Sequence, residues 1–188
     1  MTDKTRLLAG LAIVGLFCLT LLFVETESVR SASARYEGAL SCKPCHLSPK
    51  SGAQFRIWES GPHARAYRTL SSPKAKLVAS EKGIESPWDA PQCLKCHVTA
   101  FGVDEASRSD KLTVEEGVSC EACHGAGSAY SGRKVMQDIF DGKKDGAEFG
   151  LVAQSEKVCL KCHNQESPTF KGFDYSEMVA KISHKTPR

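Results

Sequence analysis

Residues 120–124 read Cys-Glu-Ala-Cys-His, and the same Cys-x-x-Cys-His pattern occurs at 42–46, 93–97 and 159–163. Chance placement of 9 cysteines and 6 histidines among 188 residues would give roughly 0.01 such copies. Two thiols three residues apart lie on one turn of the chain and can add to the two vinyl groups of one haem, and the next imidazole can bind its iron. The pattern therefore predicts four covalently attached c-type haems.

Each motif assigns two cysteines to the porphyrin and one histidine to the iron. The expected attachment residues are Cys42, Cys45, Cys93, Cys96, Cys120, Cys123, Cys159 and Cys162, and the expected proximal ligands are His46, His97, His124 and His163. Paired Cys-x-x-Cys units can also bind zinc, and the spacing from Cys96 to Cys120 would suit a zinc ribbon. Zinc does not require a histidine directly after each pair, so we expect no zinc.

An export signal precedes the motifs. Lys4 and Arg6 stand before an apolar run at 7–24, and Ala-Ser-Ala at 32–34 suits signal peptidase. We therefore expect residues 1–34 to be a signal peptide and 35–188 to form the tetrahaem domain in the periplasm. Covalent haem attachment normally takes place outside the cytoplasm, which agrees with export. The apolar run approaches the roughly 20 residues that span a bilayer, so an uncleaved membrane anchor stays open as the alternative.

The charge of the chain does not indicate a nucleic-acid partner. The net charge is +3, and removing the leader leaves it unchanged because that segment holds three basic and three acidic residues. No basic run remains in the mature part. Haem propionates would make the loaded protein more negative. The expected partners are a redox protein donor and acceptor, which the charge does not identify.

Helices are the strongest local signal in the mature chain. Pro62 suits the first position of a helix through Leu70, and Ser72-Pro73 and Gly83 bracket a second helix. A third has helical apolar spacing at 135–140. The last starts at Asp174, which forms a capping-box-like pair with the glutamate three residues later.

These signals predict a mainly α, small and loop-rich domain. The best strand signal, at 111–114, is weak. The mature chain is poor in core-forming residues, so we expect four haems to supply the apolar core. Since cofactor binding and folding are then linked, the apoprotein should be largely unfolded.

The remaining iron-binding side chains are few. Only His63 and His184 are left for the distal faces of four irons, and we expect both to be axial ligands. Methionine is the other common sixth ligand and raises the reduction potential. Met136 is the candidate for such a role, whereas Met178 continues an apolar helical stripe. At least one iron is expected to be five-coordinate.

Beyond the haem motifs, the sequence resembles the tetrahaem cytochrome c-554 family. The resemblance covers nearly all of the mature chain. It is carried by Tyr36-Glu37-Gly38, Trp58, His63-Ala64, Cys96-His97-Val98 with Phe101-Gly102, residues 117–127, and residues 173–184 with Glu177-Met178-Val179.

The resemblance implies a soluble periplasmic electron carrier with closely stacked haem pairs. It supports His63 and His184 as distal ligands and implies that the haem at His97 is the open one. The family has a third distal histidine shortly after the third motif, where this chain has none. Met136 is the nearest replacement, so the haem at His46 is either His/Met-coordinated or open. We expect an electron carrier and no enzyme; the alternative is a reductase of a small nitrogen-oxide-type ligand at an open haem.

Overall fold

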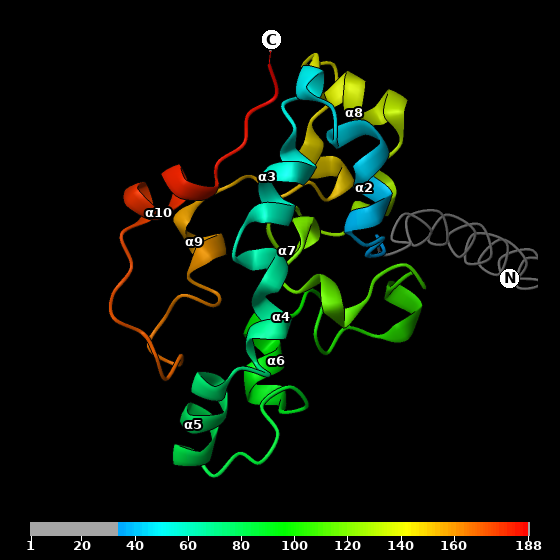
Figure 1. Ribbon diagram of the computed structural model, residues 1–188. Coiled ribbons are helices and arrows are strands. Elements are labelled where there is room, and N and C mark those ends of the chain that lie inside the picture. The colour runs from blue at the N-terminus through cyan, green and yellow to red at the C-terminus, as the bar shows by residue number, and fades with distance from the viewer. Residues whose placement is uncertain (1–33, 188) are drawn as a thin grey trace, which may run out of the picture. The chain divides into compact units, whose positions relative to one another are not determined.

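The computed structural model describes residues 34–187, so the predicted leader lies outside the described residues except for Ala34. Nine α-helices are present in this part of the chain (Figure 1). They are α2 (Ala39–His46), α3 (Gln54–Ser60), α4 (Ala66–Thr69), α5 (Pro73–Glu81), α6 (Pro91–His97), α7 (Cys120–His124), α8 (Arg133–Phe140), α9 (Glu156–Cys159) and α10 (Tyr175–Ile182). None of these helices is long and apolar enough to cross a membrane.

Short 3₁₀ turns connect many of the helices. They are η1 (Pro49–Ser51), η2 (His63–Arg65), η3 (Glu105–Ser107), η4 (Val114–Glu116), η5 (Gly127–Ala129) and η6 (Gly146–Phe149). The predicted mainly α, loop-rich class is confirmed. Residues 34–187 contain no named strand, and their one isolated bridge joins Tyr36 to Arg108.

The predicted helix boundaries agree with the structure. Ser72 caps α5 by accepting a hydrogen bond from Ala75 N at 3.1 Å. Asp174 caps α10, with its Oδ1 2.9 Å from Glu177 N. The helix expected after Pro62 forms as η2 followed by α4. The weak strand signal at 111–114 was wrong, because this segment is a turn that leads into η4.

The apolar core is small. Besides Pro87, the buried apolar residues of the described chain are Ala39, Phe55, Ala64, Leu70, Ala79, Ala90, Val98 and Tyr130. Half of them are alanines, which remove little apolar surface from water. A core this small does not stabilise the fold by itself, so the folded state depends on apolar contacts from outside its own side chains.

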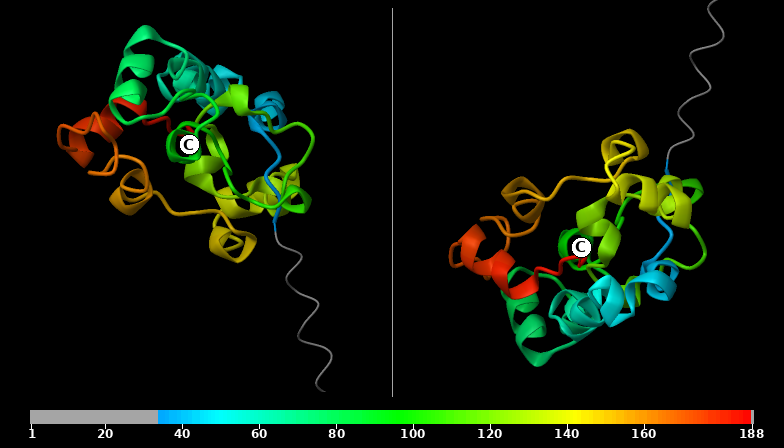
Figure 2. Two further views of the ribbon diagram at one scale, coloured as in Figure 1. Left: turned by 90° about the horizontal axis from the view of Figure 1, so that it is seen from below. Right: turned by 90° about the horizontal axis from the view of Figure 1, so that it is seen from above.

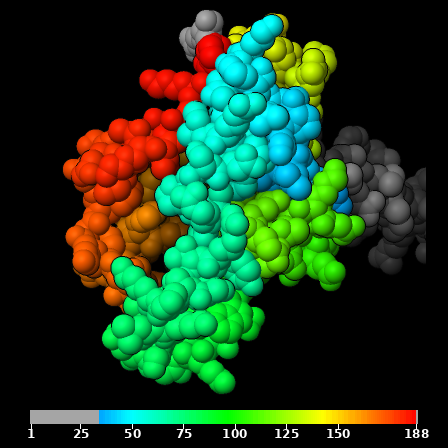
Figure 3. Space-filling model, in the orientation of Figure 1, coloured from blue at the N-terminus to red at the C-terminus, as the bar shows by residue number. Residues whose placement is uncertain are grey.

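The first and last helices of the described chain, α2 and α10, lie on either side of the segment that holds α3, η2 and α4. In Figures 1 and 2, α10 lies away from α2, and α3, η2 and α4 run between them. The same segment forms a continuous column on the face shown in Figure 3. The C-terminal tail then returns to α3, where Gln54 Nε2 donates to Thr186 Oγ1 at 3.0 Å.

Candidate haem-binding site

The motifs share a local geometry that suits one porphyrin each. Three of the four end a short helix on their histidine: α2 at His46, α6 at His97 and α7 at His124. In the fourth, α9 ends at Cys159, and His163 N continues the turn by donating to Cys159 O at 2.9 Å. Residues three apart on a helix lie on the same side, so both thiols of each helical motif face one way.

The eight motif cysteines fit covalent haem attachment. All eight are free, so no disulfide competes for the thiols. Among residues 34–187, no group of three or more histidine, cysteine or acidic side chains is arranged to hold a metal ion. The donor set of each motif suits two thioether bonds and one imidazole for a haem.

Thiols from different motifs affect one another's pKa. Before haem attachment, interaction with Cys120 lowers the pKa of Cys42, and interaction with Cys42 together with burial raises the pKa of Cys120. Burial and the neighbouring Cys96 raise the pKa of Cys162 to about 12. Burial, followed by Cys159, raises the pKa of Cys123. Thiols of the first and third motifs, of the third and fourth, and of the fourth and second are therefore close enough to influence one another.

Two pairs of imidazoles face each other. The ring centroids of His63 and His163 are 6.0 Å apart, and those of His124 and His184 are also 6.0 Å apart. Two imidazoles that bind one metal ion from opposite sides, each with a metal–nitrogen distance near 2 Å, have centroids about 6 Å apart. Each pair therefore has the separation needed to hold one iron between its rings.

Burial keeps these imidazoles in the form that can bind iron. Desolvation lowers the pKa of His63, and the nearby His163 lowers it further. Desolvation, followed by His184, lowers the pKa of His124. A neutral imidazole has the free lone pair that a metal requires.

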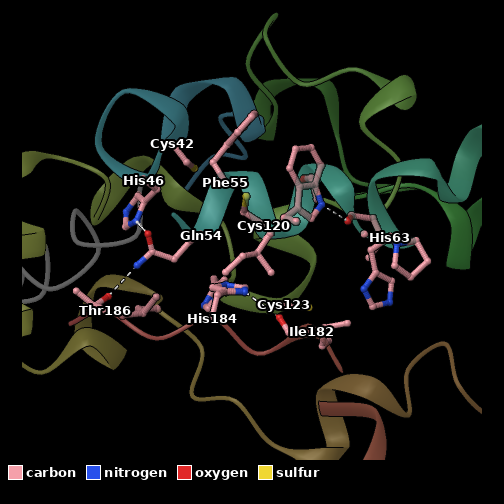
Figure 4. Close-up of a pocket in the computed structure, with 18 of the residues that line it drawn as sticks. Cys42, His46, Gln54, Phe55, His63, Cys120, Cys123, Ile182, His184 and Thr186 are labelled. Carbon is pink, nitrogen blue, oxygen red and sulfur yellow. Dashed lines mark hydrogen bonds between the residues drawn. The ribbon is translucent and has the colours of Figure 1, made fainter. Parts of the chain in front are cut away.

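Hydrogen bonds orient three of the imidazole rings. His97 Nδ1 lies 2.7 Å from Ala66 O, His184 Nδ1 lies 3.0 Å from Ile182 O, and His46 Nδ1 lies 3.2 Å from Gln54 Oε1. An Nδ1–H that donates to these oxygens leaves Nε2 free to bind a metal. Figure 4 shows the series from His46 through Gln54 to Thr186.

A cavity of about 270 Å³ collects several of these residues. The residues that line it come from the first and third motifs, the two distal candidates and α8: Cys42, His46, His63, Cys120, Cys123, His124, Met136 and His184. Figure 4 shows how His46, His63 and His184 lie around it. Met178 does not line it and is 36% exposed. Thus His63, His184 and Met136, far apart in sequence, meet the motifs at one cavity.

Two glycines permit close approach of the backbone near these motifs. A Cβ at Gly117, where φ is +65°, would lie 2.7 Å from His63 O. A Cβ at Gly38, where φ is +80°, would lie 2.8 Å from Lys111 O. Positive φ favours glycine, and the two contacts leave no space for a side chain. Gly117 in this way lets the segment before the third motif pack against His63.

Sequence reasoning missed the residues that support the site. Glu121 is 2% exposed and accepts hydrogen bonds from the backbone N–H groups of Glu37, Gly38 and Gly127. Gln54 contacts His46, and Gln154 Nε2 lies 3.3 Å from His124 Nδ1. An acidic residue inside a haem motif was the one available signal. No sequence pattern indicates that Gln54 and Gln154 contact the histidines of the motifs.

Comparison with known proteins agrees with this geometry. The family model described as cytochrome c554 and c-prime matches residues 41–125. Cytochrome c-554 of Nitrosomonas europaea is 32% identical over 90% of this chain and 73% of its own length.

The chain belongs to the cytochrome c-554 family. The solved reduced state of cytochrome c554 from Nitrosomonas europaea matches with a TM-score of 0.58 and 28% identity, covering 82% of this chain and 86% of that one. This cytochrome therefore binds c-type haem and has the family's haem-based electron-transfer function. Redox proteins are accordingly its partners.

Proposed function

We propose that this cytochrome carries electrons through four covalently bound haems in the periplasm. One haem is attached at each motif, through the cysteine pairs and proximal histidines named above. The two facing imidazole pairs carry the proposal, because each has the separation of two axial ligands on one haem iron. Closely packed porphyrins pass electrons without a conformational step. The haem supplies the redox chemistry, and the protein sets spacing, axial ligands and burial.

The facing imidazoles support an assignment of the two distal histidines. We assign His63 to the iron held by His163 and His184 to the iron held by His124, since each pair is 6.0 Å apart. His97 belongs to neither pair, which supports an open iron at the second motif. A haem iron with two axial histidines is six-coordinate and low-spin when ferric, whereas a five-coordinate ferric haem iron is high-spin.

Location in the periplasm follows from the chemistry of attachment. The expected export segment provides a route to the compartment where haem is attached. The cleaved and membrane-anchored forms of that segment remain the two expectations, since residues 1–33 lie outside the described part of the chain.

Haem counting tests the proposal directly. The pyridine haemochrome assay on purified protein is expected to give four c-type haems per chain, and a redox titration should reduce all of them reversibly. A smaller number of haems would contradict the proposal. Rapid turnover of nitrite or a similar small nitrogen oxide by the reduced protein would favour the reductase alternative.

The distal assignments predict single-haem effects. His63→Ala should convert one low-spin ferric haem to high-spin, and His184→Ala should convert a different one, because each variant removes one sixth ligand. Ferric EPR measures both changes, and the double variant should show two additional high-spin haems. Ser60→Ala is a matched control near His63, since its hydroxyl bonds only the local carbonyl of Ile57. Unchanged spin states in the histidine variants would overturn the assignment.

A further inference from the structure

Among residues 34–187, which hold all 6 histidines, no imidazole is paired with His46 in the way of the two facing pairs. The chain has 6 histidines; four form the two facing pairs, and His97 belongs to the second motif. His46 nevertheless lines the cavity, and its Nδ1 is engaged by Gln54. The iron held at the first motif therefore needs a different side chain for its sixth ligand, or it stays open.

Three other lining residues carry groups of a kind that can bind iron: Tyr130, Lys181 and Met136. The Tyr130 hydroxyl donates to Gly125 O at 2.8 Å, and burial raises its pKa, which keeps the phenol protonated. Lys181 Nζ donates to Glu177 Oε1 at 2.6 Å as an ammonium. A protonated phenol and an ammonium are poor iron ligands, whereas the Met136 thioether carries no proton.

The register of α8 turns Met136 toward the cavity. The Asp138 carboxylate forms ion pairs with Lys134 at 3.1 Å and with Lys144 at 3.9 Å. Residues two positions apart on an α-helix are separated by about 200° around its axis, so Asp138 and Met136 lie on opposite faces. The lysines hold the Asp138 carboxylate on one face of α8, and Met136 on the opposite face lines the cavity, as Leu151 also does.

We propose that the Met136 thioether is the sixth ligand of the iron held by His46, giving this one haem His/Met coordination. The proposal rests on the four-haem function proposed above and adds the ligand that distinguishes one haem from the others. Methionine opposite histidine raises the reduction potential. Electrons would therefore collect at this haem.

Optical and magnetic spectra of the ferric holoprotein test the ligand. The wild-type protein is expected to show a methionine-to-iron charge-transfer band at the red end of the spectrum. Met136→Leu should lose this band and gain one high-spin haem. Met178→Leu is the matched control: Met178 is outside the cavity lining, and its sulfur lies 3.9 Å from Lys181 Nζ. The control should keep the band.

Met136→His provides a second variant that preserves six-coordination. It should lose the band without gaining a high-spin haem, and the highest reduction potential in the titration should fall. Absence of the band from the wild-type protein, or its persistence in Met136→Leu, would overturn the proposal.

The haem count separates this inference from the proposed function. Four haems with no methionine band would reject Met136 as a ligand and leave the electron-carrier function intact. Fewer than four haems would reject the proposed function itself. If Met136→Leu does not accumulate, the wild-type spectrum and Met136→His still test whether Met136 binds the iron.

Discussion

Protein made without haem attachment is expected to lose most of its helical structure. The buried apolar residues are few and half of them are alanines, whereas ordering the backbone costs about 1–2 kcal/mol per residue. With this core, the side chains cannot offset that cost, and the porphyrins must supply the missing apolar contacts. Removal of the haems therefore removes the main source of stability.

Circular dichroism measures this effect. Residues 35–188 produced in the cytoplasm without the leader should lack haem, show a largely unstructured far-ultraviolet spectrum and have no cooperative thermal transition. The exported holoprotein is the control and should show both helix and a transition. A cooperative transition in the haem-free chain, with near-holoprotein ellipticity, would show that the side chains suffice.

Glu121→Gln is expected to lower the free energy of unfolding of the holoprotein by about 3 kcal/mol, because a buried N–H that loses its acceptor costs about 1–3 kcal/mol. The Glu121 carboxylate accepts from three backbone N–H groups, with distances of 2.8 Å to Glu37 N, 2.8 Å to Gly38 N and 2.6 Å to Gly127 N. A glutamine retains one oxygen and places an NH₂ group against the other donors. Urea unfolding followed by circular dichroism measures the loss.

Glu116→Gln is the matched control. Glu116 Oε2 accepts from Ala39 N at 2.9 Å, while its buried Oε1 has no hydrogen-bond partner. One acceptor oxygen is sufficient here, so the substitution should change the unfolding free energy by less than about 1 kcal/mol. Equal losses in the two variants would contradict the role given to the Glu121 carboxylate.

The pH dependence of this control follows from the environment of Glu116. Burial raises its pKa above the usual 4.5, so the folded state holds the proton more tightly than the unfolded state. This contribution to stability is present below pH 4.5 and is lost as the pH rises through the raised pKa. Relative to wild type, Glu116→Gln should gain stability over that range. A difference independent of pH would contradict the assignment.

Local sequence was sufficient for several parts of the fold. Ser72-Pro73 and Asp174 mark helix starts through capping, which depends on residues two or three positions away. The signal at 111–114 failed because strand formation needs a partner, and this segment passes into η4 instead. The support from Gln54 and Glu121 depends on residues brought together from distant segments, so their positions in the sequence do not reveal it.

The sequence by itself determined the haem chemistry, since the thiols and imidazole of a Cys-x-x-Cys-His motif act on one porphyrin within one turn of chain. It also limited the sixth ligands to a short list. Only the tertiary structure decided that His63 faces His163, that His184 faces His124 and that Met136 lines the cavity with His46. The residues in each of these contacts are separated by tens of positions in the sequence. Tertiary packing brings them together, so local spacing does not reveal the contacts.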